Sequence, residues 1–128
     1  MKLSVIIVTY LSQDLIGDCI SSVFRFNDLD EDELEVIVVE NSPLREATAM
    51  AAYLEERFGG KVTVLVNDSN RGYGHGNNLG ISYATGDIVA VMNPDVRLVE
   101  PLFGRALEAF QHHKRLGALG FKQLGNRD

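Results

Sequence analysis

The stretch Ile88-Val89-Ala90-Val91-Met92-Asn93-Pro94-Asp95-Val96 decides the fold, because an apolar run stops abruptly at a polar triplet. Five consecutive apolar residues in so short a segment favour a strand buried on both faces, as in a parallel sheet covered by helices. Pro94 keeps Asn93 out of the helical region, so the strand ends there and a stiff turn presents Asp95. Open α/β sheets bind ligands at the carboxyl ends of their strands, which makes Asp95 the first candidate site residue.

Apolar runs and helical stripes alternate along the rest of the chain. Strands are predicted over residues 3–9, 34–39, 62–66 and 116–121, and helices after Ser12, from Pro43 to Gly59, through Leu79 and Tyr83, and from Pro101. This alternation predicts a three-layer, Rossmann-like α/β fold with a mostly parallel sheet. The expected strand order is 3-2-1-4 plus a fifth strand.

That order opens a crevice between the first and fourth strands. Thr9 and Tyr10 follow the first strand, and Asn93 and Asp95 follow the fourth, so these residues are predicted to line the crevice. The glycine-rich stretch and the pair Glu40 and Asn41, which end the second strand, are expected alongside.

The glycine-rich stretch follows the third predicted strand and holds Gly72, Gly74, Gly76 and Gly80. Glycines allow positive φ and close approach of a ligand to backbone N–H groups, although a simple turn-rich connection is the alternative. The stretch is not a dinucleotide fingerprint, which belongs after the first strand, and the chain has no Walker sequence.

Composition narrows the function. A chain of 128 residues is one domain, and its net charge of −6 argues against nucleic acid as a partner. Cys19 is a single cysteine at an apolar helical position, which indicates a reduced, cytosolic interior residue. The first strand is too short for a signal peptide, and no apolar run is long enough to span a membrane.

An acidic protein needs a counter-charge to bind a diphosphate. Mg²⁺ is commonly held by one or two carboxylates while substrate phosphates supply other ligands, so Asp95 is the candidate metal ligand. His75 and the pair His112 and His113 lack the neighbours of a metal site, and polar or helix-terminal roles explain them.

Four stretches carry a resemblance to a known family, and they cover nearly the whole chain. They are residues 5–10, 36–42, 70–80 and 84–96, and in this order they resemble the donor-binding half of family-2 glycosyltransferases with the GT-A fold. The rhamnosyltransferase-like branch is the most similar, because there Asn-Pro-Asp stands in for the usual Asp-x-Asp.

The resemblance implies a role for each motif residue. It places Thr9 and Tyr10 beside the base of a dTDP- or UDP-sugar and Glu40 in contact with that base. By the same resemblance, the residues that border the nucleoside pocket are Asn70, Gly72 and Asn78, Asn93 lies by the ribose, and Asp95 reaches the diphosphate and a Mg²⁺ or Mn²⁺ ion. The chain departs from the family pattern at three positions: Leu11 replaces an Asn, Glu40 an Asp, and Asn93 the first Asp of the metal motif.

The resemblance also implies an inverting transfer of the sugar to a glycan or lipid-linked acceptor. Family members continue beyond the length of this chain, and that further part supplies the acceptor pocket and the catalytic base. Residues 1–128 are therefore expected to be a donor-binding domain cut before the acceptor half, with no catalytic residue assigned. Neither Asp87 nor Glu100 is a convincing base.

Two rival functions stay open at this stage. One is a non-catalytic nucleotide-sugar-binding module that works with a partner chain; the other, a sugar-nucleotide pyrophosphorylase, wants a glycine-rich loop after the first strand, where residues 10–13 have none. The remaining expectations are a homo-oligomer and a cytoplasmic location, with peripheral attachment to a membrane as an alternative.

Overall fold

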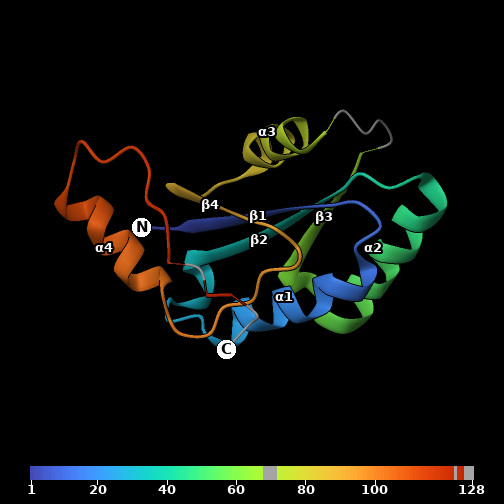
Figure 1. Ribbon diagram of the computed structural model, residues 1–128, viewed down its shortest axis with the longest axis horizontal. Coiled ribbons are helices and arrows are strands. Elements are labelled where there is room, and N and C mark those ends of the chain that lie inside the picture. Colours follow the sequence, from blue (N-terminus) through green and yellow to red (C-terminus); the bar gives the residue numbers. More distant parts are fainter. Residues whose placement is uncertain (68–71, 123, 126–128) are drawn as a thin grey trace.

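The computed structural model describes residues 1–67, 72–122 and 124–125 and shows a three-layer α/β arrangement (Figure 1). The strands are β1 (Leu3–Thr9), β2 (Leu34–Glu40), β3 (Val62–Val66) and β4 (Ile88–Met92). The helices are α1 (Gln13–Arg25), α2 (Leu44–Phe58), α3 (Tyr73–Tyr83) and α4 (Phe103–His112), with short 3₁₀ turns at Glu31–Glu33 and Gly59–Lys61. The sheet has the order β3-β2-β1-β4 and all its pairings are parallel, as the sequence predicts.

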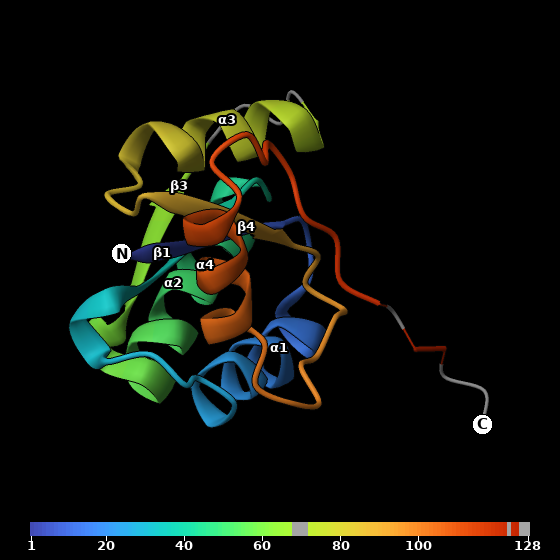
Figure 2. The same ribbon diagram turned by 90° about the vertical axis from the view of Figure 1, so that its left-hand side faces the viewer.

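Both faces of β1 are buried, and alternate residues feed two separate cores. Val5 and Ile7 face the layer of α1, α2 and α4, where the side chains include Ile20, Leu54 and Phe103. On the opposite face, Ile6 and Val8 of β1, together with Ile37 and Val39 of β2, pack against α3 (Figure 2). A strand covered on both sides explains the continuous apolar run of β1.

The expected fifth strand is wrong within the described residues. Residues 116–122 form no strand, and all of them except Leu116 are exposed. A strand is stable only when its backbone groups pair with a neighbouring strand, and this segment does not pair with the open edge of β4. Gly117 and Gly120 further weaken it because glycine is a poor strand former.

A hydrogen-bonded cluster fixes the connection into β4. The Glu35 carboxylate accepts bonds from the Ser4 hydroxyl (2.7 Å) and the Thr85 backbone N–H (2.8 Å), and the Ser4 hydroxyl accepts one from Gly86 N–H. Partial burial opposes ionisation of Glu35, but the bonds from Thr85 and Ser4 and the charge of Lys2 outweigh it and lower its pKa. The cluster therefore sets where β4 begins beside β1.

The glycine-rich stretch is mostly helix rather than loop, which corrects the expectation. Only Gly72 has a positive φ, of 96°, and it precedes the first residue of α3. A Cβ on Gly76 would lie 2.8 Å from Cγ1 of Val8, and one on Gly80 would lie 2.5 Å from Cγ2 of Ile6. These two glycines let α3 approach the sheet closely, so they serve packing.

Alanine substitutions at two glycines of α3 should have opposite effects on stability. Gly80→Ala should cost about 1–3 kcal/mol, because the new methyl overlaps the buried Ile6 side chain. Gly74→Ala should stabilise by up to about 1 kcal/mol, because nothing lies within 4 Å of its Cβ position and alanine favours helix. Urea unfolding measures both; equal effects at the two positions would contradict the packing assigned to α3.

Candidate functional site

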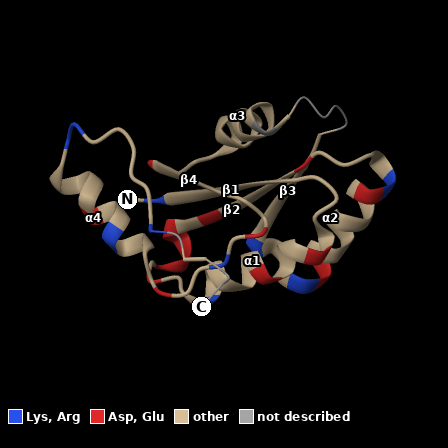
Figure 3. Ribbon diagram, viewed as in Figure 1, with Lys and Arg blue, Asp and Glu red and all other residues tan. Residues whose placement is uncertain are grey.

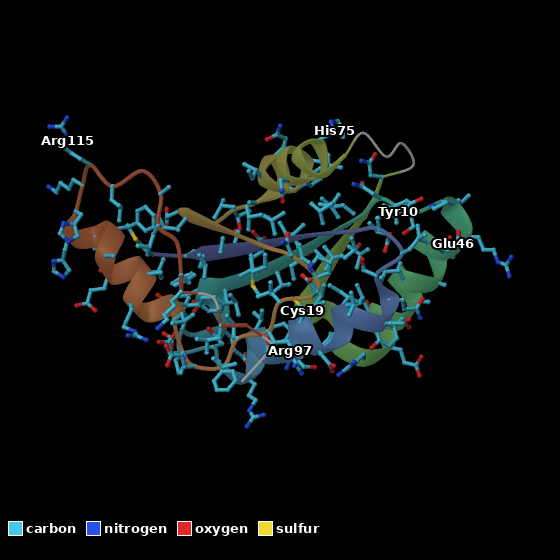
Figure 4. The ribbon with its side chains drawn as sticks, viewed as in Figure 1. Tyr10, Cys19, Glu46, His75, Arg97 and Arg115 are labelled. Atoms are coloured by element: carbon cyan, nitrogen blue, oxygen red, sulfur yellow. The ribbon has the colours of Figure 1, made fainter. Side chains whose placement is uncertain are left out.

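The carboxyl ends of the strands meet at one edge of the sheet, here called the carboxyl edge, and backbone pairing continues just past them. Asn41 N–H donates to the Thr9 carbonyl at 2.8 Å, and Asn67 N–H donates to the Glu40 carbonyl at 2.9 Å. Parallel strands therefore bring the residues after β1, β2 and β3 to the same edge. Figure 4 shows Tyr10 and Glu46 together at this end of the molecule.

Glu40 is fully buried and its carboxylate is held from two sides. Oε2 accepts a hydrogen bond from the Thr9 hydroxyl at 3.0 Å, and Oε1 accepts one from Ser42 N–H at 2.9 Å. Thr9 is also fully buried. Glu40 thus fastens the end of β2 to the end of β1, in addition to any contact with a base.

The loop after β1 is strained and faces solvent. Leu11 has φ 51°, a left-handed conformation that costs a side-chain-bearing residue about 1–2 kcal/mol, and its N–H donates to the Ser42 hydroxyl at 2.7 Å. The side chains of Tyr10 and Leu11 are 52% and 58% exposed, although both are large and apolar enough to be buried. Leu11 adjoins a recess of about 150 Å³, which is lined by Leu11, Ser12, Gln13, Asp14, Glu40, Ser42, Glu46 and Met50.

Ser42 is a site residue that the sequence did not single out. The pattern Ser-Pro predicts a helix cap, but the Ser42 hydroxyl accepts from Leu11 instead, and α2 begins at Leu44 without a side-chain cap. Ser12 likewise precedes α1 and bonds with the Tyr10 backbone rather than capping. No sequence signal distinguishes these uses of serine from capping, because both place Ser just before a helix.

Asn41 lies between the end of β2 and the first turn of α3. Its side-chain oxygen accepts from the Asn67 amide at 2.9 Å, and its amide nitrogen would be 3.1 Å from a Cβ on Gly76. Gly72 starts α3 at the same edge, so the positive end of that helix points towards the edge. Figure 3 shows that α3 itself contains no Lys, Arg, Asp or Glu.

The structure separates Asn78 from this group. Asn78 is exposed on α3, on the side away from the sheet-facing Gly76 and Gly80. Asn70 lies outside the described residues. His75 is exposed in the first turn of α3 (Figure 4), in keeping with a polar surface role.

The Asn-Pro-Asp triplet forms the turn that the sequence predicts. β4 ends at Met92, and Val96 N–H donates to the Asn93 carbonyl at 3.1 Å, which closes a four-residue turn with Pro94 in second position. The side chains of Asn93 and Asp95 are exposed. The turn follows β4, the neighbour of β1, so it stands at the carboxyl edge beside the loop after β1.

Cys19 contacts this turn from below, as the buried free thiol that the sequence predicts (Figure 4). Its sulfur donates to the Asn93 carbonyl at 3.7 Å. Burial, and secondarily the Asp95 carboxylate, raise the pKa of the thiol from 9.0 to about 12. The thiol therefore stays protonated at neutral pH, and the Asp95 charge lies close enough to α1 to act on it.

Cys19 should resist alkylation in the folded chain. The raised pKa lowers its thiolate population at pH 8 by roughly a thousandfold, and burial blocks access as well. Mass spectrometry after iodoacetamide treatment, with and without urea, measures the protection. It should persist in Asp95→Asn, because burial is the larger cause; a native thiol that reacts as fast as the unfolded one would contradict the packing of α1 against the turn.

Asp95 suits a metal ion only together with substrate oxygens. Within the described residues, no group of three or more His, Cys, Asp and Glu side chains is placed to hold an ion. Mg²⁺ and Mn²⁺ sites on diphosphates often use one or two carboxylates, with phosphate oxygens completing the coordination. The exposed Asp95 carboxylate fits that arrangement.

The two other acids considered as bases lie at the opposite edge of the sheet. Asp87 immediately precedes β4 and accepts a bond from Lys2 N–H at 2.9 Å, beside the start of β1. Glu100 pairs with Arg105 at 3.3 Å near the first turn of α4, where Gly104 N–H bonds the Asp28 carboxylate that follows α1. Neither can reach an acceptor held at the carboxyl edge.

Solved structures with the same fold are about three times longer than this chain. The S. aureus TarS 1-349 structure superposes with a TM-score of 0.73 at 23% identity, and covers 89% of this chain and 33% of its own. TarS 1-349 has also been solved in complex with UDP-GlcNAc. The mannosyltransferase PcManGT from Pyrobaculum calidifontis, in complex with GDP-Man and Mn²⁺, gives a TM-score of 0.68 at 26% identity over 79% of this chain and 29% of its own.

No described helix is both long and apolar enough to cross a membrane. The comparison with curated protein sequences found no match. The model of the family described as glycosyl transferase family 2, in contrast, matches residues 4–127. With that match over almost its whole length, and the fold in agreement, the chain belongs to glycosyl transferase family 2.

Proposed function

We propose that the carboxyl edge binds the nucleoside diphosphate of a dTDP- or UDP-sugar, and that this chain is the donor-binding part of an inverting glycosyltransferase. The observation that carries the proposal is the meeting of three features at one edge: the loop after β1, the amino end of α3 and the Asn93–Val96 turn. Each supplies a different need of such a ligand.

The base and ribose are assigned to the side of β1 and β2. Tyr10, which precedes the recess-lining Leu11, offers an exposed aromatic ring, and Glu40, held by the Thr9 hydroxyl, supplies a fixed polar group to the recess. Asn41 faces the start of α3, where Gly72 and Asn70 are assigned to the nucleoside, and Asn93 is assigned to the ribose. Asn78 has the weakest support, because its side of α3 faces solvent.

The diphosphate is assigned to the space between α3 and Asp95. The amino end of α3 favours an anion, and the neighbouring turn supplies a carboxylate for Mg²⁺ or Mn²⁺. When bound, such an ion would offset the charge that develops on the departing nucleoside diphosphate. Asp95 would hold it, and a rigid turn would keep the carboxylate in place.

The transfer itself is proposed to need a further part of the protein. An acceptor hydroxyl attacks the anomeric carbon while a base removes its proton, and the nucleoside diphosphate leaves from the opposite face. Among the described carboxylates near the carboxyl edge, Glu40 and Asp95 have assigned roles, and Asp14 and Glu46 line the recess on the side assigned to the base. The chain spans about a third of the length of its structural relatives. A donor-binding module that acts beside a partner chain is the second candidate, favoured by the same two observations.

The wider assignments follow from the donor site. We infer a glycan or lipid-linked acceptor and a cytoplasmic location, where nucleotide sugars are made available, with peripheral attachment to a membrane as an alternative. Association with a second copy or with a further domain is supported by exposed apolar side chains beyond α4, at Leu119 (43%), Phe121 (41%) and Leu124 (67%).

Thermal unfolding with ligands tests the proposal. A UDP- or dTDP-type nucleotide with Mn²⁺ should stabilise the chain by about 2.7 kcal/mol at a hundredfold excess over its dissociation constant. The nucleotide without metal should stabilise less, and adenosine diphosphate serves as the control. If no uracil or thymine nucleotide raises the melting temperature with metal present, the donor assignment is wrong.

A further inference from the structure

Two residues one turn apart on α1 contact the segment that carries Asp95. The Cys19 thiol donates to the Asn93 carbonyl at 3.7 Å, before Asp95 in the chain. Beyond Asp95, Leu98 N–H donates to the Ser22 hydroxyl at 2.9 Å. The Ser22 hydroxyl in turn donates to the Cys19 carbonyl at 2.7 Å, so one linked set of bonds from α1 brackets the turn.

No side chain of the described residues holds the Asp95 carboxylate by a hydrogen bond or an ion pair. It is exposed, and among the described residues no hydrogen bond or ion pair fixes its oxygens. Its direction therefore follows from the backbone between Asn93 and Leu98. That backbone is fixed by its own turn bond, from Val96 N–H to the Asn93 carbonyl, and by the two contacts with α1.

Packing alone does not account for Ser22. A buried helical serine commonly bonds the carbonyl three or four residues before it, and Ser22 does so. It also accepts the Leu98 N–H with its remaining acceptor capacity, which no apolar residue of similar size could do. Ser22 is only 8% exposed, so its loss would leave a donor without water to replace it.

We propose that Cys19 and Ser22 are positioning residues, which aim the Asp95 carboxylate at the diphosphate by holding the Asn93–Leu98 backbone on α1. The inference rests on the proposed function, in which Asp95 meets the diphosphate. It adds that the affinity for the metal-bound diphosphate is set partly from inside the core. Asp95 lies on the exposed side of this segment, and α1 supports the segment from the core side.

The first experiment measures how firmly the Asn93–Leu98 backbone is held when no ligand is present. In Ser22→Ala, hydrogen exchange at the Val96 and Leu98 amides should accelerate by roughly three- to tenfold, the loss expected for one hydrogen bond. Ser21→Ala is the matched control, because Ser21 is the adjacent serine of α1 and bonds Arg57 rather than the turn. Exchange at the two amides that is unchanged in Ser22→Ala would overturn the inference.

The second experiment measures the affinity for the diphosphate by calorimetry, with UDP and dTDP as probes in the presence of Mn²⁺. Ser22→Ala should bind whichever of the two nucleotides the wild-type chain binds roughly three- to tenfold more weakly. Its affinity for the corresponding nucleoside without phosphates should stay at the wild-type value. Ser22→Thr keeps the hydroxyl and should restore binding, and Cys19→Ala, which removes the other contact, should show a smaller loss in the same direction.

The possible results distinguish a failure of the proposed donor site from a failure of the positioning role of Cys19 and Ser22. A wild-type chain that binds neither diphosphate contradicts the proposed function. Normal wild-type binding that Ser22→Ala and Cys19→Ala leave intact contradicts only the positioning role. An equal loss of diphosphate and nucleoside affinity in Ser22→Ala would also overturn it, because a merely structural defect predicts that result.

Discussion

The 128-residue chain alone should bind a nucleotide sugar and transfer almost none of it. Transfer needs a general base within about 2.6–3.2 Å of the acceptor hydroxyl and an acceptor held against the anomeric carbon. At the carboxyl edge Glu40 is bonded on both oxygens and Asp95 is assigned to the diphosphate, while Asp14 and Glu46 line the recess assigned to the base of the nucleotide. Acid–base catalysis alone is worth roughly 10²–10⁴ in rate, and acceptor positioning adds more, so the loss should be nearly complete.

The measurement follows release of nucleoside diphosphate and glycosylated product over a broad acceptor panel. The matched comparison is the same chain extended by the acceptor half of a family member, which should restore turnover. Slow hydrolysis of the donor by the chain alone is compatible with the account, because water needs no acceptor pocket. Robust transfer by residues 1–128 alone would place the base within this chain, and Asp14 and Glu46 beside the recess would then be the acids to test.

Replacing Asp95 should give the second large effect. Asp95→Ala should weaken binding of UDP or dTDP, whichever the wild-type chain binds, by roughly ten- to a hundredfold when Mn²⁺ is present. This is the scale of losing one interaction with a charged group. Without metal the loss should shrink or reverse, because the carboxylate then only repels the diphosphate. The fold should be unaffected, since the Asp95 side chain is exposed and makes no hydrogen bond or ion pair with the described residues.

Titration calorimetry with and without Mn²⁺ measures this effect. Glu108→Ala is the matched control: Glu108 is also an exposed carboxylate, on α4, and it pairs with His112 at 3.8 Å. The control should bind as wild type under both conditions. If Asp95→Ala retains wild-type affinity in the presence of metal, the assignment of Asp95 to the ion is wrong.

The sheet could be predicted from the sequence because its strands depend on local pattern. The apolar runs of β1, β2, β3 and β4 are each bounded by turn residues, and parallel α/β topology allows few arrangements of such runs. The turn at Pro94 was equally predictable, since proline restricts the residue before it. The sequence therefore places Thr9, Glu40 and Asp95 on one edge without any structure.

The failures have a common cause in contacts that are distant in sequence. Residues 116–121 have the composition of a strand, but strand formation depends on a neighbouring edge that the sequence does not reveal. Gly76 and Gly80 look like loop residues, and only the closeness of Val8 and Ile6 shows that they serve helix packing. The left-handed backbone of Leu11 is likewise invisible in the sequence, because leucine is a rare choice there.

Ser22 illustrates the same limit within the site. In the sequence it is one polar residue in an amphipathic helix, adjacent to a second serine with the same chemistry. Only the bond from Leu98 distinguishes it from Ser21, and that bond joins residues 76 positions apart. A buried serine in a helix is at most a weak signal, since bonding to its own helix satisfies it equally well.

Paramagnetic broadening in NMR spectra can show whether the nucleoside diphosphate and its metal bind at the carboxyl edge. At 14.1 kDa the ¹⁵N-labelled chain suits such spectra. Substoichiometric Mn²⁺ with UDP or dTDP should first broaden the amide signals of Tyr10, Leu11, Asn41, Asn93, Asp95 and Val96, and leave those of Glu35, Thr85 and Asp87 at the opposite edge sharp. Broadening centred on Glu35, Thr85 and Asp87, or nowhere in the chain, would contradict the account.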